Sequence, residues 1–342
     1  MAQAADDVRR ILDDPEVDVV DLVRSERRPR LDRPRGGAGG QARHRREAAH
    51  RVLRRCVARR APRCSARRSA RPTTLIEACR AAGVRLCYAE NWVYAPPIQK
   101  ARRLLAAAGG PILRLVGEES HSGTHAPANK RWVTAGGGSL LGKGCHPLGG
   151  ILYLKADEGR RLRGRPVRPC LGAGRGRAAR RHRRPSAAAT PRYLNTVAGA
   201  DVEDWGGMLL RFDDGTVAQI SAADVVLGGI RNQLQVYAAK AVIFCNMNPN
   251  DAVQAYAPDP TVFGAEYITE KIETKAGWTF PQPDEDWMTG YPGEIQDFVE
   301  SVALGREPIS GGPLARDVLA VTYAAYLSAA EGRRVELGPY LR

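Results

Sequence analysis

The sequence predicts an α/β arrangement over residues 1–108 and an α+β arrangement over residues 109–337. Three observations support this prediction. Residues 4–23 and 74–108 alternate between helical and strand patterns, as chains that build parallel sheets do. Residues 204–245 give successive strand signals with a hairpin turn at Asp213-Asp214-Gly215. Residues 294–303 and 315–329 have the spacing of two amphipathic helices.

Length and cysteine content bound the class of protein. A chain of 342 residues is typical of about two domains. It has no run of about 18 apolar residues that could span a membrane, and its first residues lack the basic and apolar regions of a signal peptide. Its cysteines lack paired metal-ligand spacing, which favours reduced thiols in a cytoplasm. They are Cys56, Cys64, Cys79, Cys87, Cys145, Cys170 and Cys245.

The basic character of the chain lies entirely in two arginine-rich blocks. Residues 24–72 hold 18 Arg, no Lys and three acidic residues, and residues 159–192 hold 12 Arg and no acidic residue. The blocks contribute +15 and +12 to a net charge of +15, so the remaining chain carries −12. Neither block contains Phe, Tyr or Trp. The first block has too little apolar surface to offset its chain entropy, so we expect no folded unit there.

The first predicted domain has normal sequence on both sides of its arginine-rich block. Residues 4–23 fit a short amphipathic helix, a turn at Pro15 and a buried strand. Residues 75–84 fit a helix that ends at Gly83, residues 85–91 a strand, and residues 98–108 an alanine-rich helix. The turn before this last helix carries Asn91, Trp92, Tyr94 and Pro96.

The second predicted domain opens with a strand over residues 111–120. The hairpin of residues 205–212 and 216–223 follows, and strands over residues 232–237 and 241–245 extend the same sheet. His121 and His125 lie four residues apart, but in a loop of Ser, Gly, Thr and Pro rather than on one helix face. We therefore expect no metal site.

A glycine run at residues 136–138 leads into an apolar helical pattern that contains His146. Glycines let the backbone approach another group closely. A histidine here titrates near neutral pH and can exchange a proton, although a buried, hydrogen-bonded core histidine is an equal alternative. The run is also a near miss to a phosphate-binding P-loop. Gly144 stands where that loop needs Ser or Thr for magnesium, so we do not expect phosphate binding.

The residues around His146 resemble the motif Gly-Gly-Gly-x-Leu-Leu-x-x-Gly-x-His of the Gfo/Idh/MocA oxidoreductases. In that family the histidine follows an aspartate by four residues and serves the hydride-transfer site. Gly142 stands at the aspartate position, and Lys143 beside it could replace part of its function. The resemblance covers residues 4–23, 74–157 and about 193–337. It implies a partial Rossmann-like nucleotide-binding domain, followed by an open-faced, mostly antiparallel β-sheet domain with helices on one side.

The resemblance also implies roles for individual residues. His146 and Lys143 become the candidate catalytic residues. Asn91 and Trp92 become the candidate contacts to the cofactor, NAD or NADP, although packed aromatic side chains at a strand-to-helix turn would look the same. The implied substrate contacts are Tyr94, Arg131 and Trp132.

Two parts of the family pattern are missing. The first Rossmann strand, its glycine-rich turn and its acidic ribose contact should precede residue 4, so the chain looks N-terminally truncated. The family's Glu-Lys-Pro lysine should fall near residues 55–60, which contain no lysine. Both arginine-rich blocks have the composition of GC-rich DNA translated out of frame, and we interpret them as frameshifted segments. Genuine basic insertions that bind RNA or DNA are the alternative, although such modules usually mix Lys with Arg and include aromatic residues.

The predicted function is NAD(P)-dependent oxidation or reduction of a sugar, a cyclitol or a related polyol by hydride transfer, with His146 exchanging the hydroxyl proton. Because the Glu-Lys-Pro lysine and the glycine-rich turn of the family are missing, an inactive form of the enzyme is also possible. Within the family, a cofactor-retaining enzyme that cleaves or epimerises glycosides through transient oxidation is a second possibility. The alternative from another class is a non-catalytic scaffold or nucleic-acid-binding protein that uses the arginine-rich blocks. We expect a cytoplasmic homo-oligomer joined through the C-terminal sheet, with no membrane and no nucleic-acid partner.

Overall fold

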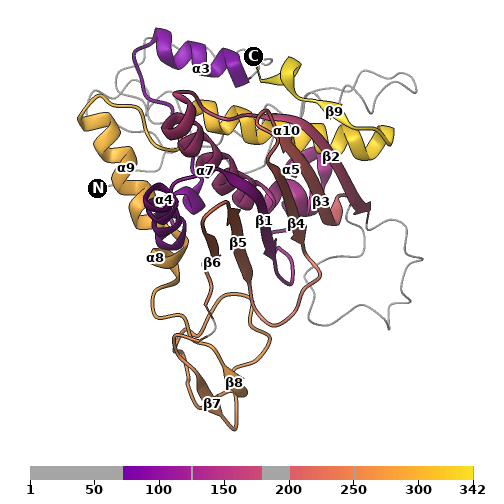
Figure 1. Cartoon of the computed structure of the whole chain (residues 1–342). Coiled ribbons are helices and arrows are strands. Elements are labelled where there is room, and N and C mark those ends of the chain that lie inside the picture. The colour runs from indigo at the N-terminus through magenta and orange to yellow at the C-terminus, as the bar shows by residue number, and fades with distance from the viewer. Residues whose placement is uncertain (1–71, 125, 179–200, 250, 342) are drawn as a thin grey trace.

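The computed structural model describes residues 72–124, 126–178, 201–249 and 251–341 (Figure 1). The helices are α3 (Pro72–Ala81), α4 (Pro96–Ala108), α5 (Trp132–Ala135), α6 (Ser139–Gly142), α7 (Cys145–Arg163), α8 (Glu285–Thr289), α9 (Tyr291–Ala303) and α10 (Gly312–Glu331). The strands are β1 (Ile112–Ser120), β2 (Pro169–Ala178), β3 (Glu203–Phe212), β4 (Val217–Ala223), β5 (Arg231–Ala238), β6 (Val242–Asn246), β7 (Ala255–Ala257), β8 (Gly277–Thr279) and β9 (Val335–Glu336). Among these residues, no helix combines the length and apolar character that crossing a bilayer requires.

Seven of the strands form one sheet in the order β6-β5-β1-β4-β3-β2-β9, and β7 and β8 form a separate hairpin. β1 and β4 are parallel, and the other neighbouring strands of the main sheet are antiparallel. β3 and β4 are the two arms of the hairpin predicted around Asp213-Asp214-Gly215. Gly215 adopts a φ of 91°, a conformation that glycine reaches without steric cost.

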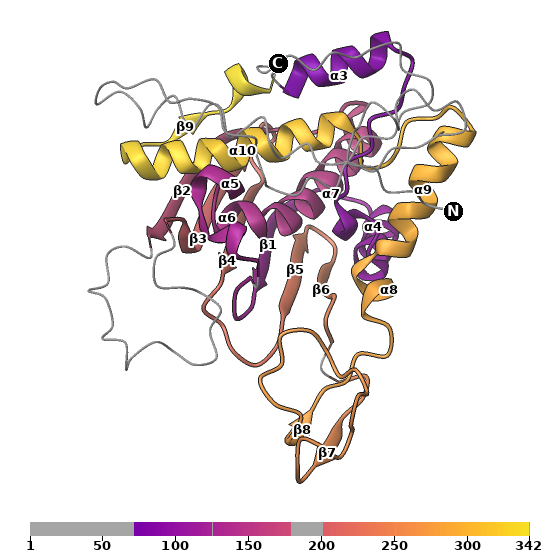
Figure 2. The same cartoon turned by 180° about the vertical axis from the view of Figure 1, so that it is seen from behind.

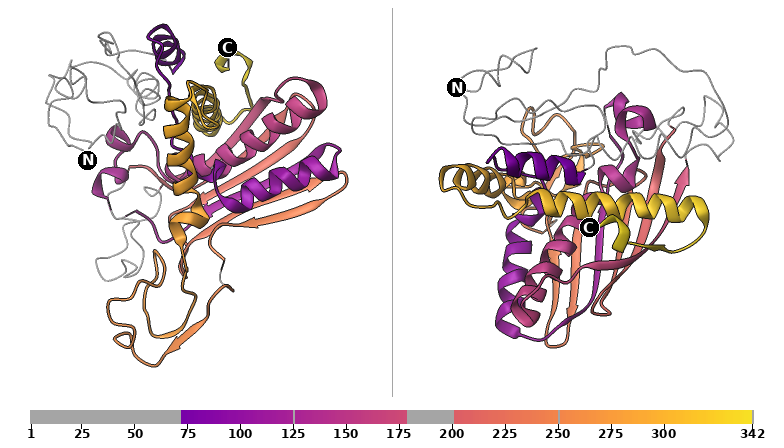
Figure 3. Two further views of the ribbon diagram at one scale, coloured as in Figure 1. Left: turned by 90° about the vertical axis from the view of Figure 1, so that its left-hand side faces the viewer. Right: turned by 90° about the horizontal axis from the view of Figure 1, so that it is seen from above.

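One face of the main sheet is covered by helices and the other is open. In β3, Met208 and Leu210 are buried, whereas Leu209 between them is 60% exposed. α7 and α10 pack against the covered face, with α4 beside α7 (Figures 2 and 3). The structure therefore confirms the predicted open-faced, mostly antiparallel sheet with helices on one side. The Rossmann-like part that the sequence predicts before residue 72 lies outside the described residues.

A buried charge network fastens α7 to the sheet. Lys155 is fully buried, and its Nζ lies 2.8 Å from both Asp214 Oδ2 and Thr216 Oγ1. Glu158, one turn further along α7, is its second carboxylate partner and accepts the backbone N–H of Ile112 at 2.6 Å. Because two carboxylates share one ammonium in the core, the network ties α7 both to the start of β1 and to the β3–β4 turn.

A second buried carboxylate holds the glycine run against β3. The carboxylate of Glu203 accepts hydrogen bonds from the backbone N–H groups of Gly138 and Leu140, both at 3.0 Å, and from the hydroxyl of Tyr326 at 2.6 Å. A Cβ on Gly138 would lie 2.1 Å from the carbonyl oxygen of Glu203, so only glycine fits. The close backbone approach that the glycine run predicts is therefore made to β3.

Residues 85–91 differ from the strand that the sequence predicts. Within the described residues they make one isolated bridge, between Cys87 and Gly311. A strand needs a neighbour to complete its ladder. The other strand predicted for this domain, within residues 4–23, lies outside the described residues.

Part of the second arginine-rich block is built into the fold. Residues 159–163 form the last turn of α7, and residues 169–178 form β2, which pairs with β3. Gly159 is required there, since a Cβ would lie 2.3 Å from the backbone nitrogen of Val167. No helix or strand is predicted from the sequence within this block, so these elements come from the structure alone. Residues 24–71 and 179–192, the other parts of the two blocks, lie outside the described residues.

Candidate functional site

A cavity of about 470 Å³ opens where the end of β1 and the starts of β5 and α7 face the segment of residues 267–291. The segment of residues 267–291 contributes nine of the sixteen residues of the cavity wall. The others are two from the turn after residue 90, Glu119 of β1 and His121 after it, His146 of α7, and Asn232 of β5 and Ile230 before it. This volume is in the range of small-molecule sites. Since segments far apart in the sequence converge here, the cavity is the candidate active site.

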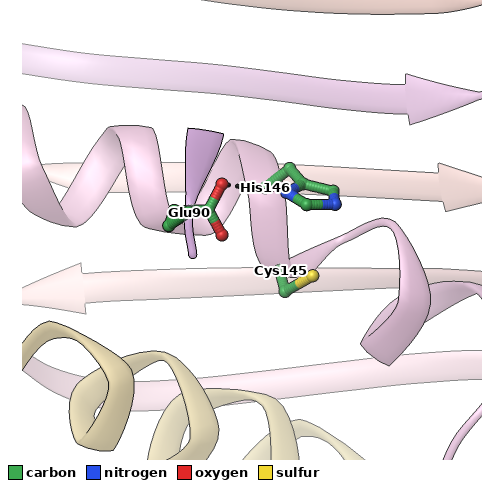
Figure 4. Close-up of side chains that lie close together, drawn as sticks. All are labelled: Glu90, Cys145 and His146. Atoms are coloured by element: carbon green, nitrogen blue, oxygen red, sulfur yellow. Dashed lines mark hydrogen bonds and ion pairs between the residues drawn. The ribbon is translucent and has the colours of Figure 1, made fainter. Parts of the chain in front are cut away.

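His146 stands in the first turn of α7, at the wall of the cavity (Figure 4). Gly144 directly precedes the helix. Only glycine fits at this position, because a Cβ would lie 2.5 Å from the carbonyl oxygen of Leu140. Pro147 follows within the first turn, where a helix tolerates proline. His146 Nδ1 lies 2.9 Å from Glu90 Oε1, and Nε2 lies on the far side of the ring. One ring nitrogen is thus held by a carboxylate, and the 26% exposed side chain leaves the other for a ligand.

Glu90, which holds His146, is a site residue that the sequence analysis missed. It ends the extended segment of residues 85–90 and is fully buried. Gly149, one turn after His146 on α7, leaves room for it, since a Cβ there would lie 2.6 Å from Glu90 Cγ. A buried carboxylate is costly unless it has a partner. The signal in the sequence is therefore a lone acidic residue at the end of an apolar segment, directly before Asn91.

The charges around the imidazole favour its protonated form. Burial lowers the pKa of His146, but the carboxylates of Glu90 and Glu119 outweigh burial and raise this pKa to about 10. Burial raises the pKa of Glu119 to about 7, against the opposing effects of His146 and Lys143. Trp92 is buried and stacks with the imidazole at a centroid distance of 6.4 Å and an interplanar angle of 21°. At neutral pH His146 is therefore a cation on an aromatic plane, ready to donate a proton.

The structure brings together three of the predicted site residues and separates a fourth from them. His146, Asn91 and Trp92 line the same cavity. Lys143 does not; it is buried and forms an ion pair with Asp224. The catalytic and cofactor-binding roles of these residues stay predictions, and the place of Lys143 gives it a clear structural role as well.

The three residues predicted to contact substrate lie outside the wall of this cavity. Tyr94 is buried and donates its hydroxyl to Asp297 at 2.8 Å. Arg131 precedes α5, and Trp132 begins it and packs edge-on against Tyr326 at a centroid distance of 5.1 Å. Their role in substrate binding stays a prediction.

Glu90, Cys145 and His146 offer donor atoms within 4.8 Å of one another (Figure 4). A thiol and an imidazolium must both lose a proton before they can bind a metal ion. Burial, followed by the charges of Glu90 and Glu119, raises the pKa of Cys145 well above its ordinary value. The pKa of His146 is raised as well. The cluster is thus better suited to holding protons than to holding a metal.

All five acidic residues in the cavity wall were also missed from the sequence. They are Glu119, Glu270, Asp284, Glu285 and Asp286. Three of them are consecutive, a pattern that in a sequence alone is typical of a solvated surface. Only the fold shows that this run, directly before and within α8, shares a wall with the end of β1.

Comparison with known proteins places these features in a family. The family model of the oxidoreductase C-terminal alpha/beta domain of the Gfo/Idh/MocA type matches residues 118–337. No curated protein sequence matches. Among solved structures, GenD2 from gentamicin A biosynthesis, in complex with NAD, is similar at 26% identity and a TM-score of 0.64. The match covers 78% of this chain and 67% of that chain.

Two further solved structures are similar at lower identity. A probable dehydrogenase from Thermotoga maritima is 18% identical with a TM-score of 0.57, over 79% of this chain and 69% of that chain. Levoglucosan dehydrogenase, in complex with NADH and levoglucosan, is 16% identical with a TM-score of 0.61, over 98% of this chain and 84% of that chain. At these identities the likeness shows the fold alone.

Proposed function

This chain belongs to the Gfo/Idh/MocA family of oxidoreductases, and we propose that it is an NAD(P)-dependent enzyme that moves a hydride to or from a sugar, a cyclitol or a related polyol. The observation that carries the proposal is His146 at the cavity wall, with Nδ1 held by Glu90 at 2.9 Å. The GenD2 structure contains NAD, and levoglucosan dehydrogenase contains NADH and a sugar derivative. Both support a nicotinamide cofactor, and the second also supports a polyol-type substrate.

The residues beside His146 fit the nicotinamide end of such a cofactor. Asn91 Nδ2 donates to the carbonyl oxygen of Thr289 at 2.8 Å, which fixes the orientation of the amide. No hydrogen bond within the described residues uses the Asn91 side-chain oxygen, so it is suited to accept one from a carboxamide. Trp92 adds a flat apolar side chain to the same wall. We propose that both hold the cofactor, which supplies the hydride donor or acceptor when bound.

His146 exchanges the proton of the substrate oxygen through Nε2. Glu90 fixes the tautomer and the orientation of the ring through Nδ1. In carbonyl reduction the imidazolium donates its proton to the oxygen, and a pKa of about 10 keeps it charged at neutral pH. In alcohol oxidation the ring must first be neutral. This direction should therefore become faster as the pH rises toward that pKa.

The test compares the full chain with His146→Asn. The wild type is assayed for reduction of NAD and NADP with glucose, myo-inositol and levoglucosan. His146→Asn should lower kcat by about 100- to 10,000-fold. As a control for folding and cofactor binding, both proteins should show the same rise in melting temperature with the preferred nucleotide. The proposal is wrong if neither nucleotide stabilises the wild type and no polyol is oxidised.

We also propose that the open face of the sheet joins copies of this chain. Leu209, Val217, Val242 and Phe244 are between 46% and 68% exposed. The strand register places all four on the open face. An exposed apolar patch of this kind is typical of a surface that another chain covers. Light scattering of Leu209→Arg should show a smaller species than the wild type.

The cytoplasm is the proposed compartment. The cysteines in the described residues, Cys79, Cys87, Cys145, Cys170 and Cys245, form no disulfide with one another. Reduced thiols are the usual state in a cytoplasm. A thiol titration of the unreduced, purified chain under denaturing conditions would check this.

A further inference from the structure

The wall of the cavity is strongly acidic. Its acidic residues are Glu119, Glu270, Asp284, Glu285 and Asp286, and its histidines are His121 and His146, of which His146 is an imidazolium at neutral pH. Among the described residues that line the cavity there is no Lys and no Arg. A concave site with low-dielectric walls concentrates the potential of such a charge set. The potential favours a ligand that carries positive charge over a neutral one of the same shape.

Hydrogen bonds hold part of the acidic segment in place. Glu285 Oε1 accepts a hydrogen bond from Asn248 Nδ2 at 2.8 Å, and Glu285 Oε2 accepts one from the hydroxyl of Tyr267 at 2.6 Å. The backbone N–H of Glu270 donates to the same Oε2 at 3.2 Å. Asp284 caps α8 by accepting the backbone N–H of Trp287. These hydrogen bonds fix the carboxylates of Glu285 and Asp284. The carboxylate of Glu270 is paired with Lys271 at 2.9 Å, and Asp286 is exposed.

Three buried acceptor atoms in this wall have no hydrogen-bond partner in the structure. They are Glu119 Oε2, Asn232 Oδ1 and Gln282 Oε1, on residues that are 9%, 6% and 9% exposed. A flip of the Gln282 amide, which would exchange its oxygen and nitrogen, would break an existing hydrogen bond, since Nε2 already donates to the carbonyl oxygen of Pro249 at 2.5 Å. An ionised carboxylate can only accept. Because buried polar atoms in folded proteins are normally paired, this wall is built for a ligand with several N–H or O–H donors.

Two of these acceptors lie next to each other. Glu119 on β1 and Asn232 on β5 are directly opposite in the antiparallel ladder. Side chains at such positions have Cβ atoms about 4.5–5.5 Å apart. A hydroxyl group has one proton to donate and cannot serve both acceptors. An ammonium group has three, and its charge also matches the carboxylate.

We propose that the substrate is an amino sugar or an aminocyclitol whose ammonium group binds between Glu119 and Asn232. The inference rests on the proposed function and names its substrate class. Even beside His146 and Lys143, burial raises the pKa of Glu119 to about 7. A bound ammonium keeps this carboxylate ionised. The other carboxylates of the wall add attraction along the approach to the site.

The test measures kcat/KM and calorimetric binding for glucose, for its 2-, 3-, 4- and 6-amino derivatives and for the matching N-acetyl derivatives, all with the full chain. At least one amino sugar should exceed glucose by about 10- to 100-fold in kcat/KM. Its N-acetyl derivative, which has a nitrogen but no charge, should lose this advantage. Glu119→Gln should reduce the preference to less than threefold. Glu118→Gln, a matched control whose side chain lies on the opposite face of β1, should retain it.

The outcomes separate the two proposals. Equal kcat/KM for glucose and for every amino derivative would overturn this inference and leave the hydride-transfer function standing. Calorimetric binding of an amino sugar in preference to glucose, without turnover of any sugar, would support the ammonium site and overturn the hydride-transfer function. If Glu119→Gln does not fold, Asp286→Asn replaces it, since Asp286 is exposed. This change should lower the amino-sugar preference by about 2- to 5-fold, and an unchanged preference would count against the inference.

Discussion

Replacing Glu90 with Gln tests the pairing on which the proposed proton exchange depends. The substitution keeps the size of the side chain and removes its charge. Glu90 is the first of the groups that raise the pKa of His146, and burial acts in the opposite direction. Without the charge, this pKa should fall from about 10 toward its ordinary value of 6.5. A change of three to four units corresponds to roughly 5 kcal/mol of preference for the imidazolium form.

The change can be measured directly and through catalysis. The NMR titration of the His146 ring protons should show the lower pKa in Glu90→Gln. The rate of alcohol oxidation should rise up to about pH 10 in the wild type and level off nearer pH 6–7 in the variant. Carbonyl reduction should show the reverse, with activity lost above the same pKa. Glu118→Gln, which lies on the open face of the sheet, is the matched control and should leave both profiles unchanged.

The same substitution changes the pH dependence of stability. A histidine whose pKa is raised in the folded state stabilises the fold fully below its unfolded value, and this contribution is lost as the pH rises through the folded value. The free energy of unfolding of the wild type should therefore decline between about pH 6.5 and pH 10, and that of Glu90→Gln should not. A His146 pKa in Glu90→Gln within one unit of the wild-type value would refute the reasoning.

Three further changes test the framework of the site. Lys155→Met leaves Asp214 without its buried countercharge and should lower the free energy of unfolding in urea by about 3–5 kcal/mol. Burial raises the pKa of Asp214, but hydrogen bonds from Lys155 and Thr216 outweigh it and lower this pKa below 3.8. The contribution of Asp214 to wild-type stability should therefore be lost as the pH falls from about 3.8 through the lowered value, and the variant should lack most of this loss. Lys143→Met, which leaves Asp224 buried and unpaired, should cost a similar amount, and a kcat loss above 100-fold in fully folded protein would reveal a chemical role beyond the ion pair. Gly149→Ala puts a methyl group against the carboxylate at residue 90 and should destabilise the protein in thermal melts, whereas alanine at an unobstructed helical glycine stabilises by about 0.5–1 kcal/mol.

The parts of the fold set by local pattern could be predicted, and those set by tertiary contact could not. The β3–β4 hairpin follows from two strand patterns that flank an Asp-Asp-Gly turn, and α9 and α10 follow from helical spacing. β2 has no such pattern, because its Gly- and Arg-rich sequence becomes a strand through its neighbours. At Gly174 a Cβ would lie 2.5 Å from the carbonyl oxygen of Ala325, so α10 and β2 approach through a glycine that in isolation weakens a strand.

The same division holds for the site. His146 was found because a motif surrounds it in the sequence. Glu90 lies 56 residues away from it, and the sequence offers no rule that pairs the two. Glu119 and Asn232 become neighbours only through the register of β1 and β5. Which charged side chains face each other across a cavity is decided by contacts between distant segments. The periodicity within one segment carries no information about these contacts.

The way Glu203 is seated has a consequence for where nucleotide phosphates can bind. In glycine-rich turns that hold nucleotides, backbone N–H groups point at a phosphate that arrives from solution. Here the N–H groups of Gly138 and Leu140 already point at a carboxylate that belongs to the chain. A tethered anion competes at an effective concentration on the order of millimolar or more, so free phosphate is excluded from this turn. The backbone N–H groups of Gly138 and Leu140 are thus already occupied by the carboxylate of Glu203, and the phosphates of any dinucleotide must bind to another part of the protein.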